Sequence, residues 1–176
     1  GNATGKENFP VIYVTWYGAR EFAAYAGGSL PTEAQWEYAC RGGIEDKSFG
    51  LGNGMTLTKN LANFNWQMEC ENGNMVMNGN TPSTSTVAVD SYTPNAFGLY
   101  NMHGNVREWC SDWYGNYAAD PVGADSGTYR VFRGGSWSDM YLFCRCGFRN
   151  MPNPALRAVN PEQGDDKVGF RIVMPL

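Results

Sequence analysis

The sequence predicts an α+β fold, in which two helices come first and short strands joined by long loops follow. Two amphipathic segments fall within residues 15–43, whereas past residue 50 only short segments carry an alternating pattern. A run of helices followed by a run of strands is typical of the α+β class. The chain has 176 residues, 43% of them apolar, which suits one domain with one hydrophobic core over residues 1–176.

Both expected helices carry start and stop signals. Residues 15–26 place four apolar side chains at the i, i+3, i+4, i+7 spacing of one helix face: Ala19, Phe22, Ala23 and Ala26. Gly27 then ends this helix. The second helix begins after Thr32, whose spacing to Gln35 predicts a capping box, and Gly42 stops it. Its expected buried stripe is Trp36, Ala39 and Cys40.

The rest of the chain predicts loops and short strands. Residues 50–86 are rich in Asn, Gly, Ser and Thr without periodicity, which predicts a long loop. Loops of this length inside a compact domain are generally functional or held by a clamp such as a metal. Short strand-like segments follow: Asn105–Tyr114, Arg130–Trp137, Phe143–Arg149 and Lys167–Met174. In the last of them, apolar side chains alternate along the chain, at Val168, Phe170 and Ile172.

Charge and hydropathy argue against two classes of partner. The net charge is −4 and the sequence pI is near 5.0, whereas nucleic-acid-binding domains usually carry a basic face. No apolar run approaches the roughly 20 residues needed to span a bilayer. The sequence therefore predicts neither nucleic-acid binding nor a membrane span.

The five cysteines carry no zinc-ribbon or thioredoxin signal, because they form no C-x-x-C pair. Cys144 and Cys146 flank a single residue, so a strand would place both side chains on one face. Small buried hydrophobic residues are the favoured interpretation, ahead of a metal or redox role. A long-range disulfide such as Cys110 with Cys144 stays an open alternative.

Four separated blocks of the sequence resemble the formylglycine-generating-enzyme family, also called sulfatase-modifying factors. The blocks follow the family's order: Pro10–Trp16 with Leu30–Ala39, Pro94–Val106 with Glu108-Trp109, Arg130–Trp137, and Cys144-Arg145 with Arg149 and Gly169–Arg171. The resemblance implies a C-type-lectin-like fold of this subtype, with little regular secondary structure. It therefore agrees with two early helices, short antiparallel strands and long loops.

The family's catalytic thiols are absent from their expected place. Founding members of the family oxidise a cysteine of a sulfatase peptide to formylglycine with copper(I) and oxygen. They use two cysteines five residues apart, just after the Gly-Gly-Ser block, because copper(I) needs soft thiolate ligands. Here residues 137–143 contain no cysteine, and the second catalytic position falls on Tyr141. Cys144 and Cys146 match structural positions instead, so we expect no copper and assign no catalytic residue.

Calcium is the metal that the resemblance favours. An iron-dependent branch of the family needs several histidines, and this chain has only His103, which we expect to be a structural or surface residue and not a ligand. Transferred residue by residue, the family's calcium site uses oxygen atoms of Asn101, Gly104, Val106 and Glu108. The alternative is that Glu108 caps a backbone group or pairs with an arginine. A second calcium site at Asn63 and Phe64 has no matching Asp, and Arg107 replaces a family Trp.

A family member without catalytic thiols still offers a surface for binding. In the C-terminal third, mixed aromatic and polar inserts without helical or strand period separate the framework residues. Exposed aromatic side chains beside a rigid framework are typical of ligand surfaces. The predicted contact residues are Ser138, Asp139, Met140, Tyr141, Phe143, Phe148, Asn150 and Met151. The alternative is a hydrophobic turn packed under the neighbouring long loop.

This layout also resembles the variable proteins of diversity-generating retroelements, which place hypervariable positions between the same framework residues. Their adaptable surfaces work as antibody paratopes do. We therefore expect a non-catalytic module that binds a protein or glycan, in an extracellular, cell-surface or virion setting rather than the cytoplasm. Two alternatives stay open: a divergent formylglycine-generating oxidase that uses Cys144 and Cys146, and a structural domain of a surface assembly.

Overall fold

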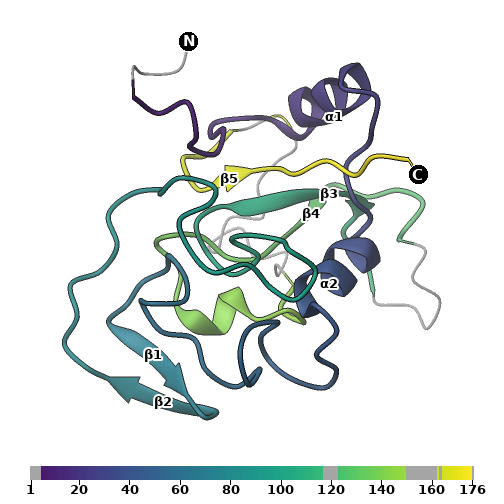
Figure 1. Ribbon diagram of the computed structural model, residues 1–176. Coiled ribbons are helices and arrows are strands. Elements are labelled where there is room, and N and C mark those ends of the chain that lie inside the picture. The colour runs from purple at the N-terminus through teal and green to yellow at the C-terminus, as the bar shows by residue number, and fades with distance from the viewer. Residues whose placement is uncertain (1–4, 117–122, 150–161, 163, 176) are drawn as a thin grey trace.

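Two helices and a few short strands, joined by long connections, make up the fold (Figure 1). The computed structural model describes residues 5–116, 123–149, 162 and 164–175. The helices are α1 (Trp16–Tyr25), α2 (Glu33–Arg41) and a 3-10 turn, η1 (Tyr141–Cys144). The strands are β1 (Met68–Glu71), β2 (Asn74–Met77), β3 (Arg107–Trp113), β4 (Arg130–Arg133) and β5 (Val168–Gly169). The α+β class predicted from the sequence is confirmed.

Both helices begin and end where the sequence predicts. The Thr15 side chain caps α1 by accepting a hydrogen bond from the Gly18 N–H. The capping box of Thr32 and Gln35 is present at the start of α2, and Gly42 ends this helix in the left-handed conformation at φ 56°. The predicted burial differs at one residue of α1: Phe22 belongs to the predicted buried stripe but is 54% exposed.

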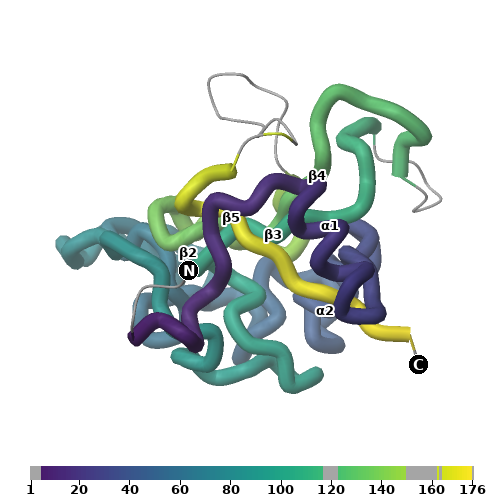
Figure 2. Tube along the Cα trace, turned by 90° about the horizontal axis from the view of Figure 1, so that it is seen from above, coloured from purple at the N-terminus to yellow at the C-terminus, as the bar shows by residue number. Residues whose placement is uncertain are grey.

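The central sheet has the strand order β4-β3-β5. β3 pairs antiparallel with β4, with a register shift between Trp109 and Trp113. β5 adds to the other edge of β3 in parallel, so the final predicted strand contributes only two residues to the sheet. Beyond β5 the chain runs beside α1 (Figure 2), where Val173 forms an isolated antiparallel bridge with Ser29.

The predicted loop over residues 50–86 contains a hairpin that the composition did not indicate. β1 and β2 pair antiparallel around a turn in which Asn72 and Gly73 have φ values of 50° and 83°. Positive φ at both central residues is the geometry of tight hairpin turns, and Asn-Gly is their strongest sequence signal. The Asn-Gly pair therefore indicates the hairpin correctly. The loop was predicted because the polar composition of the whole segment was given more weight.

The strand predicted over residues 143–149 is wrong. Asp139 accepts hydrogen bonds from the backbone N–H and the hydroxyl group of Ser136, so the chain turns directly after β4. η1 follows and packs against the glycine turn, where a Cβ on Gly135 would lie 2.6 Å from the Cys144 sulfur. Tyr141–Cys144 therefore forms a 3-10 turn and not a strand, and Cys144 and Cys146 do not share a strand face.

Three clusters of buried side chains form the core of the described part of the chain. One lies between α1 and the sheet and includes Trp16, Ala19, Trp109, Phe132 and Val168. The second lies under residues 49–70 and includes Phe49, Leu57, Phe64, Tyr141 and Cys144. The third surrounds α2 and includes Trp36, Cys40, Met102, Cys110 and Cys146. None of the helices within these described residues is long and apolar enough to cross a membrane.

Candidate functional site

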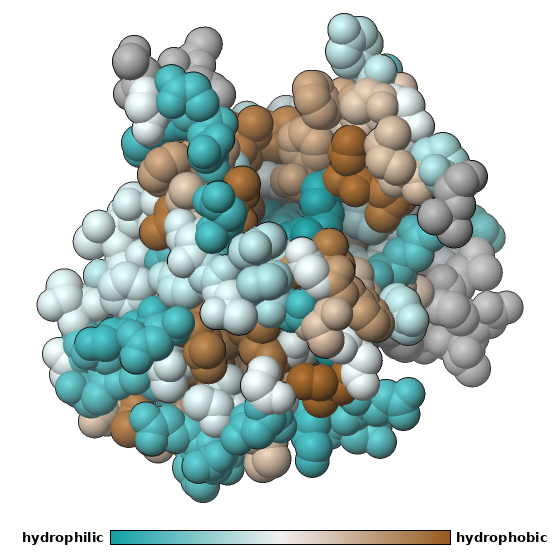
Figure 3. Space-filling view, in the orientation of Figure 1, coloured by the Kyte–Doolittle hydropathy of each residue, from teal (hydrophilic) through white to brown (hydrophobic). Residues whose placement is uncertain are grey.

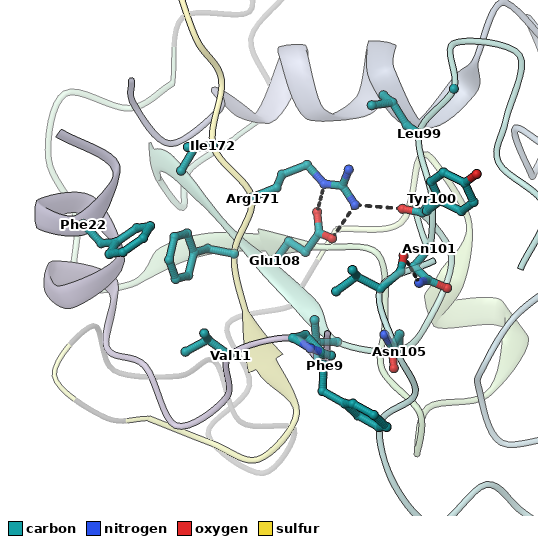
Figure 4. Close-up of a pocket in the computed structure, with 15 residues that line it drawn as sticks. Phe9, Val11, Phe22, Leu99, Tyr100, Asn101, Asn105, Glu108, Arg171 and Ile172 are labelled. Carbon is teal, nitrogen blue, oxygen red and sulfur yellow. Dashed lines mark hydrogen bonds and ion pairs between the residues drawn. The ribbon is translucent and has the colours of Figure 1, made fainter. Parts of the chain in front are cut away.

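A groove of about 490 Å³ opens between the N-terminal segment, α1 and the chain that leaves β5. Its walls are apolar and include Phe9, Val11, Phe22, Leu99, Phe170 and Ile172. Figure 3 shows hydrophobic side chains at the edges of this hollow, and Figure 4 shows them around a polar centre. The exposure of Phe22 is explained here, because its ring contacts that of Phe170 edge-on at 5.6 Å on the groove wall.

An ion pair occupies the polar centre of the groove. The Arg171 guanidinium donates to both carboxylate oxygens of Glu108, at 2.5 and 2.7 Å, and Trp36 Nε1 donates to the same carboxylate at 2.6 Å. Burial has the largest single effect and lowers the pKa of Arg171, but the charge and the hydrogen bonds of Glu108, with smaller contributions from Cys40 and Cys110, together outweigh it and the pKa is raised. The alternative role of Glu108, pairing with an arginine, is therefore present in the structure.

The structure gathers three of the four expected calcium ligands around this ion pair. Asn101, Val106 and Glu108 all line the groove. Asn101 adopts φ 53°, and its amide nitrogen donates to the Val89 carbonyl at 2.7 Å. Its side-chain oxygen is buried and has no hydrogen-bond partner among the described residues. An orphaned buried acceptor is uncommon in proteins, and an amide oxygen of this kind belongs to the ligand types that calcium takes.

Gly104, the fourth expected ligand, lies where two loops meet. Its N–H donates to the Gly134 carbonyl at 2.7 Å, and Asn105 N–H donates to the Asn63 carbonyl at 2.6 Å. A Cβ at Gly104 would lie 2.1 Å from the Asn63 oxygen, and φ is 82°. Only glycine fits this conformation and this close approach, so the position is fixed by packing as well as by any ligand role.

The predicted contact segment begins at a tight polar anchor. Arg107 binds the Asp139 carboxylate in a bidentate ion pair, at 2.8 and 2.6 Å, and both side chains are largely buried. Arg107, which stands where the family has Trp, is thus the partner of Asp139. Sequence reasoning missed this role, because the two residues lie 32 positions apart without a local signal. Asp139 supports the segment from beneath.

The other predicted contact residues divide between support and surface. Tyr141 is 8% exposed and packs into the second core cluster. Ser138 and Met140 are half-buried, and Phe143 packs edge-on against Phe148 with ring centroids 5.0 Å apart. Leu142, which was not predicted, is 38% exposed. Asn150 and Met151 lie outside the described residues.

Arg133, which is buried, and Arg149, which is partly exposed, hold the far end of this segment. Arg133 donates to the carbonyls of Cys146, at 2.7 Å, and Phe148. Arg149 forms a bidentate pair with Glu33 at the start of α2, with both contacts at 2.7 Å. The framework arginines recognised in the sequence therefore tie the segment to α2 and β4.

The five cysteines are all buried and unbridged. Cys110 and Cys144, the pair left open as a disulfide, belong to different core clusters. Cys144 and Cys146 likewise face different clusters, so they do not form a joint thiolate site. The Cys146 sulfur instead lies 3.1 Å from that of Cys40. The Cys40 thiol donates to Cys146 and lowers its pKa to about 5, whereas burial raises the pKa of Cys40 itself.

His103 is a buried residue that bonds to the backbone, and not a surface residue, which was the other role that the sequence left open. The ring is 1% exposed, and its Nε2 accepts a hydrogen bond from the Gly50 N–H at 3.0 Å. Its Nδ1 lies 2.7 Å from the Cys144 carbonyl. Because a carbonyl only accepts, Nδ1 carries the hydrogen and the imidazole is neutral.

Comparison with known proteins places this architecture in a family. The sulfatase-modifying factor enzyme 1-like domain matches residues 1–176. The formylglycine-generating enzyme of Streptomyces coelicolor is 39% identical over 175 residues, which cover 96% of this chain and 53% of the enzyme. The inactive Cα-formylglycine-generating enzyme 2 of Bos taurus is 34% identical over 168 residues, covering 94% of this chain and 50% of that protein. This chain thus spans about half the length of these relatives.

Among solved structures, Treponema denticola variable protein 1 superposes with a TM-score of 0.70 over 98% of this chain and 74% of that chain, at 24% identity. At this identity the likeness shows a shared fold. The motifs in their order, the fold they adopt and the match over the whole chain lead to one conclusion: this chain belongs to the sulfatase-modifying factor, or formylglycine-generating-enzyme, family.

Proposed function

We propose that this domain is a non-catalytic ligand-binding module whose contact surface lies on residues 138–148. The supporting observation is the arrangement of that segment. The Arg107–Asp139 ion pair fixes one end and Arg133 fixes the other, while partly exposed side chains lie between them. Rigid anchors with adaptable side chains between them suit a surface that binds partners without reorganising its backbone.

The thiols of the chain support the same proposal. The family's copper chemistry needs two thiolates that reach one metal ion and a cysteine substrate. Cys144 and Cys146 face separate core clusters, and Cys146 is in contact with Cys40. Cys40 and Cys146 are each 0% exposed, so a substrate peptide does not reach their sulfurs. The inactive bovine relative, as its name states, is a family member without the activity.

Within this module, the contact surface consists of side chains that are at least partly exposed: Ser138, Met140, Leu142, Phe143 and Phe148. Asp139 and Tyr141 support them from below. The partner is a surface protein or a glycan. The fold shared with Treponema denticola variable protein 1 supports a further step, in which natural copies of the gene differ at these surface positions.

Screening on glycan and surface-protein arrays tests the binding proposal. The wild-type domain is compared with a Phe143→Ala/Phe148→Ala variant and with Tyr25→Ala, a control at an aromatic residue that is 89% exposed on α1. Loss of array signal only in the double variant supports the assigned surface. Equal signals from all three proteins would contradict the assignment of the binding surface to this segment.

A divergent formylglycine-generating oxidase is the second candidate, and the 39% identity to the Streptomyces coelicolor enzyme favours it. This candidate is tested by incubating the domain with copper(I), oxygen and a cysteine-containing sulfatase peptide. Aldehyde formation in the peptide that is lost in a Cys146→Ala variant would assign the oxidase.

Calcium is the metal proposed for the groove. Asn101, through its orphaned oxygen, Glu108 and the Val106 carbonyl, which line the groove, would hold it together with the carbonyl of Gly104, next to the lining residue Asn105. Glu108 accepts three hydrogen bonds from Arg171 and Trp36, which leaves about one of its four lone-pair positions for a cation. The donor set therefore fits a structural calcium ion of modest affinity, which would stabilise the irregular backbone of the central motif.

A further inference from the structure

Sulfur-containing side chains gather on one face of the β1–β2 hairpin, which lies away from α1 (Figure 1). The register pairs Met68 with Met77 and Cys70 with Met75. Side chains two positions apart in a strand point to the same face of the sheet, so both pairs share one face of the ribbon. Every sulfur-containing residue of β1 and β2 therefore lies on that face.

The pairing brings these side chains close together. The Cys70 N–H donates to the Leu57 carbonyl at 3.0 Å, and the Cys70 carbonyl accepts from the Leu57 N–H at 2.8 Å, so both groups point away from β2. Such a residue forms a non-hydrogen-bonded pair with its partner on the other strand, and the Cβ atoms of the pair lie about 4.5–5.5 Å apart. Met68 has the same phase in β1, so both sulfur pairs are of this closely spaced type.

The two strands differ in their exposure. Cys70 is 4% exposed and belongs to the second core cluster, and Met68 packs against that cluster. On β2, Met75 and Met77 are 58% and 67% exposed. Side chains this exposed bury little apolar surface, so packing does not account for methionine at these two positions. The sulfur face is therefore held by the core along β1 and open to solvent along β2.

The thiol of Cys70 makes only a weak hydrogen bond, which a metal ion can replace. It donates to the Met55 carbonyl at 3.3 Å. Burial raises the pKa of Cys70 by more than the Gly73 backbone and the Arg145 charge lower it, so the thiol keeps its proton until a metal ion displaces it. The Met55 methyl group lies 2.9 Å from the position of a Cβ on Gly73, so a further thioether borders the tip of the hairpin.

We propose that this hairpin face binds one copper(I) ion through the Cys70 thiolate and the thioethers of Met75 and Met77. Thiolate and thioether sulfur are the soft ligands that select copper(I), whereas zinc takes thiolate, imidazole and carboxylate ligands. Sulfur ligands about 2.3 Å from one metal ion lie about 4 Å apart, which flexible methionine side chains reach at this strand spacing.

Binding changes no oxidation state. The copper(I) ion replaces the proton of the Cys70 thiol, which is released to water. The proposed site has one thiolate and two thioethers, so it differs from the two-thiolate copper site of the family's oxidases. It does not rest on the ligand-binding function proposed for residues 138–148.

Competition with bicinchoninate, a coloured chelator of copper(I), measures binding under anaerobic conditions with ascorbate. The wild-type domain should withdraw one equivalent of copper(I) from the chelator. Met75→Leu/Met77→Leu keeps the size and apolar character of two exposed side chains, so it should unfold at the same Tm as the wild type. Even the loss of a residue that only supports a metal ligand weakens metal sites by about tenfold, so this variant should bind at least about tenfold more weakly.

Two further variants decide where the ion binds. Met174→Leu, at a methionine that is 57% exposed outside the hairpin, should bind like the wild type. Equal affinity in the wild type and in Met75→Leu/Met77→Leu would overturn the proposal. Loss of binding in Cys146→Ala would also overturn it, because the ion would then lie at the contact between Cys40 and Cys146.

Methionine oxidation gives a second readout, residue by residue. Silver(I), a soft ion with the same ligand preference, is added to the wild-type domain before hydrogen peroxide, and methionine sulfoxide is mapped by mass spectrometry of the digested protein. We expect silver(I) to protect Met75 and Met77 and to leave the oxidation of Met174 unchanged. Oxidation of Met75 and Met77 that is the same with and without silver(I) would contradict the proposed ligands.

Discussion

The ion pair between Arg107 and Asp139 anchors the proposed binding surface, and its contribution to the free energy of unfolding can be predicted. The side chains of Arg107 and Asp139 are 14% and 11% exposed and share two charge-assisted hydrogen bonds. Removing one partner of a buried pair typically costs 3–5 kcal/mol. Asp139 keeps its bonds from Ser136, and some solvent remains. Arg107→Met should therefore cost about 3 kcal/mol, or about 9 °C in Tm.

A double-mutant cycle isolates the pair from other effects of the substitutions. Urea unfolding is measured for the wild type, Arg107→Met, Asp139→Asn and the double variant, and we expect a coupling energy of about 2 kcal/mol. The control is the cycle for Arg20 and Glu21, whose side chains are 52% and 69% exposed, with an expected coupling under about 0.5 kcal/mol. Additivity within about 0.5 kcal/mol at Arg107 and Asp139 would refute the reasoning.

Three further predictions address packing and the metal. Gly104→Ala should cost more than about 3 kcal/mol in urea unfolding, because its Cβ would meet the Asn63 carbonyl. Gly98→Ala, with similar φ but open space, should cost about 1 kcal/mol; equal losses would contradict this. Tyr141→Ala should lower stability by about 3 kcal/mol, since the ring is buried; an unchanged Tm would place it on the surface. Millimolar calcium should raise Tm relative to EGTA, and Asn101→Ala should remove that rise; a rise that persists in the variant would move the site elsewhere.

The helices were predictable from sequence because their signals are local. The capping box of Thr32 and Gln35 and the left-handed Gly42 act within a few residues, and both ends of α2 agree with the prediction. The hairpin turn at Asn72-Gly73 was equally local, and weighing it above the polar composition of the segment would have found β1 and β2.

The prediction of a strand over residues 143–149 was wrong because contacts with residues outside this segment decide its conformation. The turn that Asp139 forms, and the packing of η1 on Gly135, decide where that chain goes. The composition of a short segment does not reveal which distant contacts its chain will make.

The candidate site was predicted in part. Asn101 and Glu108, two of the calcium ligands expected from the central motif, line one groove in the structure, and their role as ligands stays a prediction. Its partner Arg171, 63 positions away from Glu108, belonged to a recognised motif, but nothing in the sequence linked the two. The contact between Cys40 and Cys146 spans 106 positions in the same way. Pairings of this kind arise from the tertiary fold, for which a single sequence carries no periodic or local signal.

We propose that this family member binds a ligand and does not oxidise the cysteine of a sulfatase peptide. The most direct test of this proposal is turnover of a cysteine-containing sulfatase peptide by the copper(I)-treated domain in the presence of oxygen, with the Streptomyces coelicolor formylglycine-generating enzyme as the positive control. The peptide aldehyde is followed by mass spectrometry. We expect aldehyde with the control enzyme and none with this domain. Copper-dependent formation of formylglycine by this domain, across repeated turnovers, would contradict it.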